Sequence, residues 1–307
     1  MPGDPSPEDD NAYELLDAGD GRRLERFGAR VVDRPAPGAR ERRLADFLTW
    51  RRADLRFDGT TGWFGDGAAM EPWVVSMAGI RMELRPTASG GLGLYPEHAA
   101  NLGWVSDRLA ERHASTERGR QPGAERGTEL GVAPHPDGAA AATPQVLNLF
   151  AHTGLVTLGA ALAGAAVAHL DASKGTVDWA RRNAALSGLD DRPIRWLVDD
   201  ALGFVAREAR RDRRYDGIVL DPPSFGRAGR RQWRLLDELP SLLEACASVA
   251  TADVFLLLTA HTAGLEGNEL ANAVAAAFPG ARPEIVPMGL DAASGARLDL
   301  GWAVRMG

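Results

Sequence analysis

The sequence has few of the features that mark secreted, disulfide-bonded or membrane proteins. Its 307 residues include one cysteine, Cys246, which excludes an internal disulfide and a multi-cysteine zinc site and favours a reducing compartment. The longest apolar stretches, such as 155–170, are rich in alanine and glycine and are shorter than the roughly 20 residues that span a bilayer. Residues 1–10 are acidic and proline-rich, unlike a signal peptide. We therefore expect a cytoplasmic protein with no membrane partner.

Lysine is as rare as cysteine. Of the 35 lysine and arginine residues only Lys174 is lysine, and the other 34 are arginine. Genomic base composition, which also favours alanine and glycine, is the simplest explanation. The net charge of −7 argues against a protein that coats nucleic acid indiscriminately, because such binding needs a broadly basic surface. A local basic patch remains compatible with this charge.

The first half of the chain has an irregular, β-like pattern. Residues 1–12 are predicted to form a disordered tail, and 13–96 a small strand-rich N-terminal module that presents the substrate. Short β-like runs within this module, separated by Gly-rich turns, occur at 29–33, 53–57, 73–77 and 80–84. The next segment, 97–143, is expected to hold a helix at 99–112, where apolar residues recur about every 3.6 positions, followed by a flexible linker at 113–143.

From residue 144 to 307 strands and helices alternate. Strands are expected at 146–150, 166–170, 194–198, 217–220 and 254–259, and helices at 155–164, 174–187, 202–210, 233–249 and 269–278. Repeated βα units predict the α/β class, with a Rossmann-like, mostly parallel sheet covered by helices on both faces. The last two strands, 283–288 and 298–304, have no helix between them and predict a C-terminal hairpin whose edge strand runs antiparallel.

In such sheets ligands bind beyond the carboxyl ends of the strands. The first strand runs into NLFAHTG at 148–154, where Gly154 permits a tight turn and a close approach of the backbone to a ligand. Asp171 follows the second strand and can accept both hydroxyls of a ribose. It could instead cap the helix that begins at Lys174, a role that Ser173 could also fill.

Two further strand ends carry acidic residues. Asp199 and Asp200 follow the third strand, where a carboxylate can accept from an adenine amino group, although a solvated acidic turn is an equal alternative. The fourth strand ends in DPPSFG at 221–226. Two prolines hold their carbonyls as fixed acceptors, and Phe225 supplies a ring, so the segment can bind the edge and the face of a planar heteroaromatic amine. A proline-rich strand exit with a chance aromatic is the alternative.

These segments resemble the class I S-adenosylmethionine-dependent methyltransferases, in particular the bacterial 23S rRNA branch that methylates cytosine C5 or guanine N7. The resemblance rests on 148–154, 171–183 and 214–226, covers 144–307, and extends loosely to 13–28 and 93–101. It implies S-adenosylmethionine as cofactor, with Gly154 at its methionine part, Asp171 at its ribose and Asp200 at its adenine. The candidate cofactor-binding residues are Asn148, Phe150, Thr153, Gly154, Asp171, Ser173, Lys174, Asp199, Asp200 and Ala201. The candidate catalytic residues, facing the methyl acceptor, are Asp221, Pro222, Pro223 and Phe225.

The sequence departs from the family pattern in two respects. Many class I enzymes have an acid and several glycines in the first motif, where this chain has Asn148 and a single glycine. Cytosine-C5 methylation also needs a cysteine nucleophile. Cys246 lies inside a predicted helix and reads as a buried core thiol, so we expect methylation of a ring or exocyclic nitrogen instead.

A basic segment with an aromatic residue follows the Asp-Pro-Pro motif. Arg227, Arg230, Arg231 and Trp233 are the candidate RNA-binding residues, because arginines can contact phosphates and a ring can stack on a base. The five arginines within 207–214 could add to this patch or form a solvated helix end. His98, His152 and His261 are candidate neighbours of the site, but their spacing matches no metal motif and no metal is expected.

The leading hypothesis is therefore a methyltransferase acting on RNA, most simply rRNA. A small-molecule or protein methyltransferase on the same scaffold is the first alternative, since a fold does not determine a substrate, and the acidic net charge favours it somewhat. A cofactor-binding RNA-interaction protein without catalysis is the second. The oligomeric state is left open.

Overall fold

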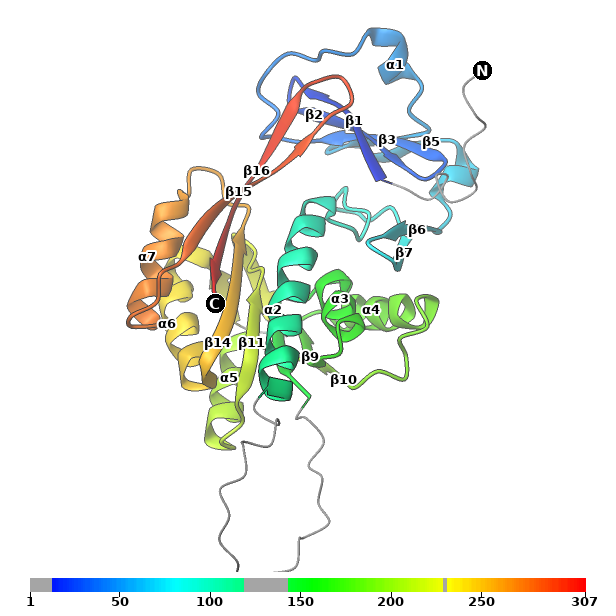
Figure 1. The fold of residues 1–307 in the computed structure, drawn as a ribbon. Coiled ribbons are helices and arrows are strands. Elements are labelled where there is room, and N and C mark those ends of the chain that lie inside the picture. The colour runs from blue at the N-terminus through cyan, green and yellow to red at the C-terminus, as the bar shows by residue number, and fades with distance from the viewer. Residues whose placement is uncertain (1–12, 119–142, 229–230) are drawn as a thin grey trace, which may run out of the picture.

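The computed structural model describes residues 13–118, 143–228 and 231–307, which form a strand-rich N-terminal part and a larger α/β part (Figure 1). The predicted tail at 1–12 and most of the predicted linker lie outside the described residues. Among the helices that are described, none is long and apolar enough to cross a membrane.

A seven-stranded sheet forms the centre of the α/β part, in the order β10-β9-β8-β11-β14-β16-β15. The strands are β8 (Gln145–Leu149), β9 (Ala166–Asp171), β10 (Ile194–Val198), β11 (Tyr215–Leu220), β14 (Ala250–Ala260), β15 (Glu284–Asp291) and β16 (Arg297–Met306). The pairs from β10 to β14 are parallel. Strand order reverses between β8 and β11, which places the carboxyl ends of these two strands side by side and creates the usual ligand position of such folds.

Helices cover both faces of the sheet because its buried strands are apolar on both sides. The helices are α2 (Ala99–Arg118), α3 (Leu155–Leu162), α4 (Lys174–Leu186), α5 (Ala201–Arg210), α6 (Leu235–Ser248) and α7 (Gly267–Ala277). One core joins Leu147 and Leu149 of β8 to α5, α6 and α7. Val146, the residue before Leu147, faces a second core with α2 and α3, as the two-residue alternation of a strand requires. The predicted α/β class and two-sided sheet are confirmed.

Three sequence-based expectations need correction. The antiparallel strand is β16, which lies one position in from the edge, whereas the edge strand β15 runs parallel to β14. Helix α2 continues to Arg118, so the expected linker begins later than 113. The helix expected from 233 begins at Leu235, because Trp233 belongs to a small hairpin of β12 (Phe225–Ala228) and β13 (Arg231–Arg234).

The N-terminal part is built from strands, as predicted. It contains β1 (Tyr13–Gly19), β2 (Arg22–Phe27), β3 (Arg30–Pro35), β4 (Leu55–Asp58) and β5 (Gly62–Gly65), which form one sheet, and the hairpin of β6 (Trp73–Met77) and β7 (Ile80–Leu84). Short helices follow β3, β5 and β7: α1 (Phe47–Arg51), η2 (Gly67–Met70) and η3 (Pro96–His98), the last two of 3-10 type.

Two of the contacts that join the N-terminal part to the α/β part lie at β7 and at β1. Strand β7 packs on α4, where the indole of Trp179 donates to the carbonyl of Glu83 at 2.9 Å. The β15–β16 hairpin extends from the large sheet to β1, where the amide of Ala293 donates to the carbonyl of Leu15 (Figure 1). Strands β7 and β1 of the N-terminal part are therefore attached to the α/β part at two separate places, α4 and the β15–β16 hairpin.

Candidate active site

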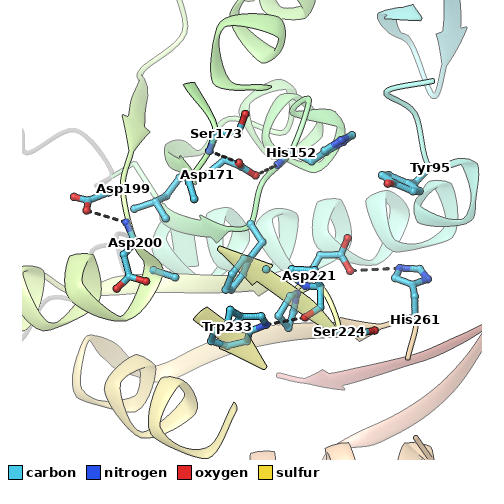
Figure 2. Close-up of a pocket in the computed structure, with 17 residues that line it drawn as sticks. Tyr95, His152, Asp171, Ser173, Asp199, Asp200, Asp221, Ser224, Trp233 and His261 are labelled. Atoms are coloured by element: carbon cyan, nitrogen blue, oxygen red, sulfur yellow. Dashed lines mark hydrogen bonds and ion pairs between the residues drawn. The ribbon is translucent and has the colours of Figure 1, made fainter. Parts of the chain in front are cut away.

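A cavity of about 520 Å³ opens at the carboxyl ends of β8, β9, β10 and β11 (Figure 2). Its walls are formed by residues from these four strand ends, from the β12–β13 hairpin and from two segments far away in the sequence. They are Tyr95, Phe150, His152, Leu170, Asp171, Ala172, Ser173, Asp199, Asp200, Ala201, Asp221, Pro222, Pro223, Ser224, Gly226, Trp233 and His261. Most of the residues predicted from the sequence thus meet at one place.

The loop after β8 is shaped by unusual backbone conformations. Phe150 and His152 have φ angles of 55° and 48°, and Gly154, which precedes α3, has a φ of 93°. Positive φ values are costly for residues other than glycine and cluster at ligand-binding loops. A Cβ on Gly154 would lie 3.0 Å from that of Ala180, so a side chain would crowd this turn. The loop therefore offers a close-fitting backbone surface to a ligand.

Asn148 and Thr153 support this loop from behind. The Asn148 amide donates to the Thr157 hydroxyl at 2.9 Å, and the Thr153 hydroxyl donates to the carbonyl of Gly93. Both side chains are buried, and with Gly154 they line a small adjoining pocket of about 40 Å³ instead of the main cavity. These two side chains hold the loop in shape, and their contact with a cofactor stays a prediction.

Asp171 receives two backbone hydrogen bonds. Its Oδ2 accepts from the amide of His152 at 3.0 Å and its Oδ1 accepts from the amide of Ser173 at 2.9 Å. The cap of α4 is Ser173, whose hydroxyl oxygen accepts from the amide of Thr176, so the proposed capping role of Asp171 falls to its neighbour. A carboxylate can accept further hydrogen bonds, and that of Asp171 faces the cavity.

Lys174 is the cofactor candidate that lines neither the cavity nor the adjoining pocket. Its side chain is 78% exposed, and its ammonium forms an ion pair with Asp178 one helical turn further along α4. Because it begins the helix that starts beyond Ser173, the side chain extends over solvent instead of the cavity. The structure does not support the predicted cofactor contact.

The acids after β10 have local partners and also line the cavity. Asp200 caps α5, since its Oδ2 accepts from the amide of Gly203 at 2.8 Å, and its own amide donates to Asp199 at 2.9 Å. Asp199 forms an ion pair with Arg207. The other arginines of 207–214 include Arg211 and Arg214, which pair with Glu208 and Asp212. This favours the alternative of a solvated helix end over an extension of an RNA-binding patch.

The Asp-Pro-Pro segment after β11 forms the opposite wall. The indole of Trp233 donates a hydrogen bond to the carbonyl of Pro223 at 2.7 Å. This bond engages the carbonyl and fixes the indole as part of the cavity wall. Trp233 is buried, so its predicted role in RNA binding is limited to its cavity face. Phe225 does not line the cavity: its ring is 76% exposed on β12, while the backbone of Gly226 faces inward. Tyr95, Phe150 and Trp233 supply aromatic walls instead.

For the three predicted RNA-binding arginines, the structure describes no side-chain position. Arg227 and Arg231 pair with Gln232 and Ala228 across the β12–β13 hairpin, at the edge of the cavity wall. Arg230 lies outside the described residues. Their contact with RNA stays a prediction.

Asp221 is surrounded by three side chains, one from η3 and two from the end of β14. Its carboxylate accepts from the Thr259 hydroxyl at 2.6 Å and lies 3.3 Å from Nε2 of His98 and 3.4 Å from Nε2 of His261. Burial alone would raise its pKa, but the two histidines hold that pKa well below the usual value. In the opposite direction, the Asp221 carboxylate overcomes burial and raises the pKa of His261 to about 9. The carboxylate is therefore ionised at neutral pH and His261 is a cation.

The sequence named His98, His152 and His261 only as candidate neighbours, and it missed Tyr95. All four residues meet here, because η3 returns the segment around 95–98 to the cavity and β14 delivers His261. Tyr95 packs on His152 with ring centroids 5.1 Å apart. Burial lowers the pKa of His152, so this imidazole is neutral at physiological pH.

Cys246 takes no part in the site. It is fully buried in α6 within the core on the far side of the sheet from α2, and burial raises the pKa of its thiol to about 12. This confirms the prediction of a core thiol. Such a cysteine supplies no thiolate nucleophile.

The donor set of the cavity fits a nucleoside cofactor with an amino-acid tail. A tight glycine turn lines the adjoining pocket, carboxylates follow β9 and β10 in the cavity, and a rigid proline segment lies opposite them. A parallel sheet with these strand ends defines an α/β protein that binds a nucleoside-containing cofactor.

Comparison with known proteins identifies the family. A model described as S-adenosylmethionine-dependent methyltransferase matches residues 133–254. The crystal structure of the S-adenosylmethionine-dependent methyltransferase from Agrobacterium tumefaciens is 31% identical, with a TM-score of 0.82, and the match covers 96% of this chain and 89% of that one. The chain belongs to the S-adenosylmethionine-dependent methyltransferases.

Two curated relatives share part of the α/β region. Ribosomal RNA large subunit methyltransferase K/L of Methylococcus capsulatus is 41% identical over 108 residues, which are 32% of this chain and 15% of that protein. Ribosomal RNA large subunit methyltransferase K of Neisseria meningitidis serogroup B is 40% identical over 89 residues, 29% of this chain and 25% of that protein. The chain therefore matches only a quarter or less of the length of these relatives.

Proposed function

We propose that this protein transfers the methyl group of S-adenosylmethionine to a nitrogen of a base in ribosomal RNA of the large subunit. One observation carries the proposal: the acids after β9 and β10 and the Asp-Pro-Pro segment after β11 line a single cavity. The partial similarity to two rRNA methyltransferases supports the choice of RNA. The buried thiol of Cys246 supports nitrogen over cytosine C5. A cytoplasmic location goes with this proposal.

The residues of the cavity divide into two groups in this proposal. The carboxylate of Asp171, with Ser173 beside it, accepts hydrogen bonds from the ribose hydroxyls. The adenine is faced by Asp199, Asp200 and the amide of Ala201. The backbone of 150–154 holds the methionine part. At the other end Asp221, Pro222 and Pro223 orient the acceptor base, with Tyr95 and Trp233 as apolar surfaces.

When bound, the cofactor supplies a methyl group on a sulfonium, and the neutral thioether is the leaving group. Transfer therefore needs no covalent intermediate with the enzyme. Transfer from the sulfonium would break the S–C bond as the new N–C bond forms, so positive charge would move from sulfur to the acceptor nitrogen. An exocyclic amine would then lose a proton to solvent as the product leaves, whereas a ring nitrogen with a free lone pair would have no proton to lose. The residues of this chain align the two reactants and exclude water from the cavity, which is the main source of rate in such a displacement.

The test is transfer of radiolabelled methyl groups into rRNA from a strain that lacks this gene, followed by mass spectrometry of the nucleosides. We expect one methylated nucleoside to appear, with the label on a base nitrogen. Rerunning the assay with rRNA from the parent strain gives a matched control, since its site is already modified. Label entering protein or small molecules but not rRNA would support the first alternative, and cofactor binding without any transfer the second.

A further inference from the structure

The group that we call the Asp221 clamp consists of Asp221 and the three side chains on its carboxylate: His98, Thr259 and His261. They come from η3 and from the end of β14, which are distant in the sequence. His98 is buried, and its Nε2 faces Oδ2 of Asp221, whereas Nε2 of His261 and the Thr259 hydroxyl face Oδ1. Both oxygens of the carboxylate are therefore engaged, and Figure 2 shows the contact of Asp221 with His261.

The hydrogens on the His261 ring follow from its neighbours. Nδ1 lies 2.7 Å from the carbonyl oxygen of Leu300, which can only accept, so Nδ1 carries a hydrogen. Nε2 faces a carboxylate, which also only accepts, so both nitrogens donate. The charged groups around this ring are Asp221 on one side and Glu97, with Oε1 3.9 Å from Nδ1, on the other. The rings of Tyr95 and His98 complete its surroundings.

The acceptor for His261 is produced by a β-bulge in β16. Met288 of β15 pairs with Gly301, and the next residue, Gly289, pairs with Asp299, so Leu300 is an extra residue on β16. Bulges next to active sites redirect backbone or side-chain groups toward the ligand. Gly301 has a φ of 100°, and a Cβ there would overlap the carbonyl of Ala260. The bulge thus turns the Leu300 carbonyl toward His261.

A separate chain of contacts orients His98. Nη2 of Arg305 donates to Oδ1 of Asn101 at 3.0 Å, which fixes the direction of that amide. Its Nδ2, 3.4 Å from Nδ1 of His98, is then the donor of this pair. His98 consequently carries its hydrogen on Nε2, where it donates to Asp221. Two features of β16, the bulge and Arg305, therefore determine that each imidazole donates to the Asp221 carboxylate through its Nε2.

We propose that His98 and His261 are positioning residues that hold the Asp221 carboxylate ionised and in one orientation, so that it accepts a hydrogen bond from an N–H of the acceptor base and takes no proton from it. The inference rests on the proposed function. It assigns to β16 and η3, outside the family's strand-end motifs, a role in orienting the methyl acceptor. A carboxylate held by three donors is a weak base, because each donor stabilises its charged form.

The test compares His98→Gln, His261→Gln and His261→Ala with the wild-type protein. Alanine at 261 removes a donor to the Asp221 carboxylate, and each glutamine replaces an imidazole N–H by a neutral amide of different geometry, so we expect kcat to fall about tenfold or more while the Kd for S-adenosylmethionine stays within about twofold. Glutamine at 261 keeps one donor and should retain more activity than alanine. The wild-type rate should fall as pH rises through about 9, where His261 loses its proton, and this limb should vanish in His261→Gln. His113→Gln on α2 serves as the matched control with wild-type kcat.

A second measurement does not depend on activity. NMR of labelled imidazoles should show His261 protonated on both nitrogens at pH 8 in the wild-type protein and neutral in Asp221→Asn. Unchanged kcat in the glutamine variants, or a neutral His261, would overturn the proposal. So would stoichiometric binding of Mn²⁺ or Zn²⁺ that His261→Ala abolishes, because the imidazoles would then be metal ligands. A protonated His261 without methylation of rRNA would preserve the clamp and reject the proposed substrate.

Discussion

At the scale of single residues, the carboxylate of Asp171 connects two backbone segments. Its two oxygens accept from the amides of His152 and Ser173, so it joins the loop after β8 to the start of α4. The φ of 48° at His152 is maintained partly by this bond. Asp171 therefore shapes the cofactor loop as well as presenting lone pairs to the cavity.

We predict that Asp171→Asn weakens the binding of S-adenosylmethionine by about 10-fold to 100-fold, measured by calorimetry. The amide group of asparagine would place a donor against one of the two backbone donors, which costs about 1 to 3 kcal/mol. Lys174→Arg is the matched control, three residues away, and should bind as the wild-type protein does, since the Lys174 side chain is exposed and pairs with Asp178. Equal affinities of Asp171→Asn and the wild-type protein for S-adenosylmethionine would show that Asp171 does not contact the cofactor.

At the scale of elements, the segment that carries Tyr95 and His98 is positioned by a glycine. Gly93 has a φ of 86°, its carbonyl accepts from the Thr153 hydroxyl, and a Cβ there would overlap the ring of Trp179. The chain thus passes between α4 and the cofactor loop at a point where only glycine fits. This contact brings η3 to the cavity.

We predict that Gly93→Ala lowers the melting temperature and reduces methyl transfer, because either the Trp179 ring or the segment leading to η3 must shift. Gly103→Ala is the matched control. Gly103 lies in α2, and a Cβ added there meets no atom within 4 Å, so alanine should raise stability by about 0.5 to 1 kcal/mol. Thermal melts and single-turnover rates check both variants. A Gly93→Ala protein with wild-type stability and rate would show that this segment does not position the site.

The sequence predicted most elements of the α/β part, because buried parallel strands and amphipathic helices have distinct periodicities. It predicted Asp171, Asp200 and Asp221 as site residues because each follows a strand. The β12–β13 hairpin escaped it, since a short polar segment lacks an apolar alternation and Trp233 reads as the start of a helix. Tyr95 escaped because its approach to the cavity depends on contacts between residues far apart in the sequence.

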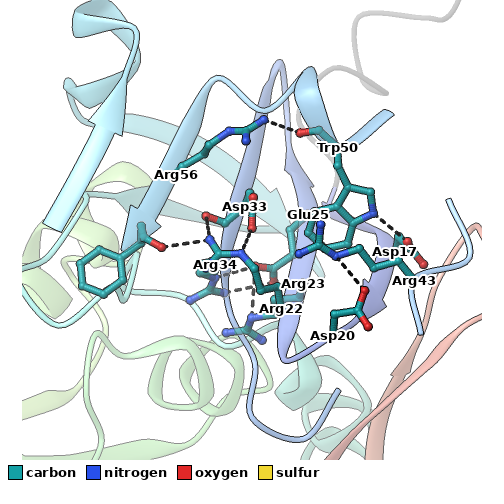
Figure 3. A network of polar contacts seen from close by, with 11 residues as sticks. Asp17, Asp20, Arg22, Arg23, Glu25, Asp33, Arg34, Arg43, Trp50 and Arg56 are labelled. Atoms are coloured by element: carbon teal, nitrogen blue, oxygen red, sulfur yellow. Dashed lines mark hydrogen bonds and ion pairs between the residues drawn. The ribbon is translucent and has the colours of Figure 1, made fainter. Parts of the chain in front are cut away.

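At the scale of the whole molecule, charged side chains inside the N-terminal part tie it together (Figure 3). Glu25 is fully buried, accepts from Arg34 at 2.5 and 3.0 Å, and lies 3.3 Å from Arg23. Asp17 accepts from the Trp50 indole at 2.8 Å and from the Ser294 hydroxyl at 2.7 Å. One carboxylate thus joins β1, α1 and the tip of the β15–β16 hairpin, a few residues before the Leu300 bulge in β16.

Two histidines give the stability of the whole protein a maximum between acid and base. His169 on β9 is fully buried, its Nδ1 lies 2.8 Å from the Thr157 hydroxyl, and burial lowers its pKa from 6.5 to about 3. The unfolded chain therefore binds more protons than the folded one between pH 6.5 and about 3, and stability falls as the pH drops through that range. His261 acts in the opposite sense: its folded pKa of about 9 adds stability below pH 6.5 that is lost as pH rises through 9.

We accordingly predict a free energy of unfolding that peaks near pH 6.5 and decreases on both sides, by at most about 1.4 kcal/mol per pH unit for each histidine. Denaturant unfolding between pH 4.5 and 9.5 measures it. His169→Gln should flatten the acid side and leave the alkaline side unchanged, because it removes only the buried neutral imidazole. His261→Gln should flatten the alkaline side alone. An acid limb that persists in His169→Gln would mean that other groups, such as the buried His152, control acid unfolding.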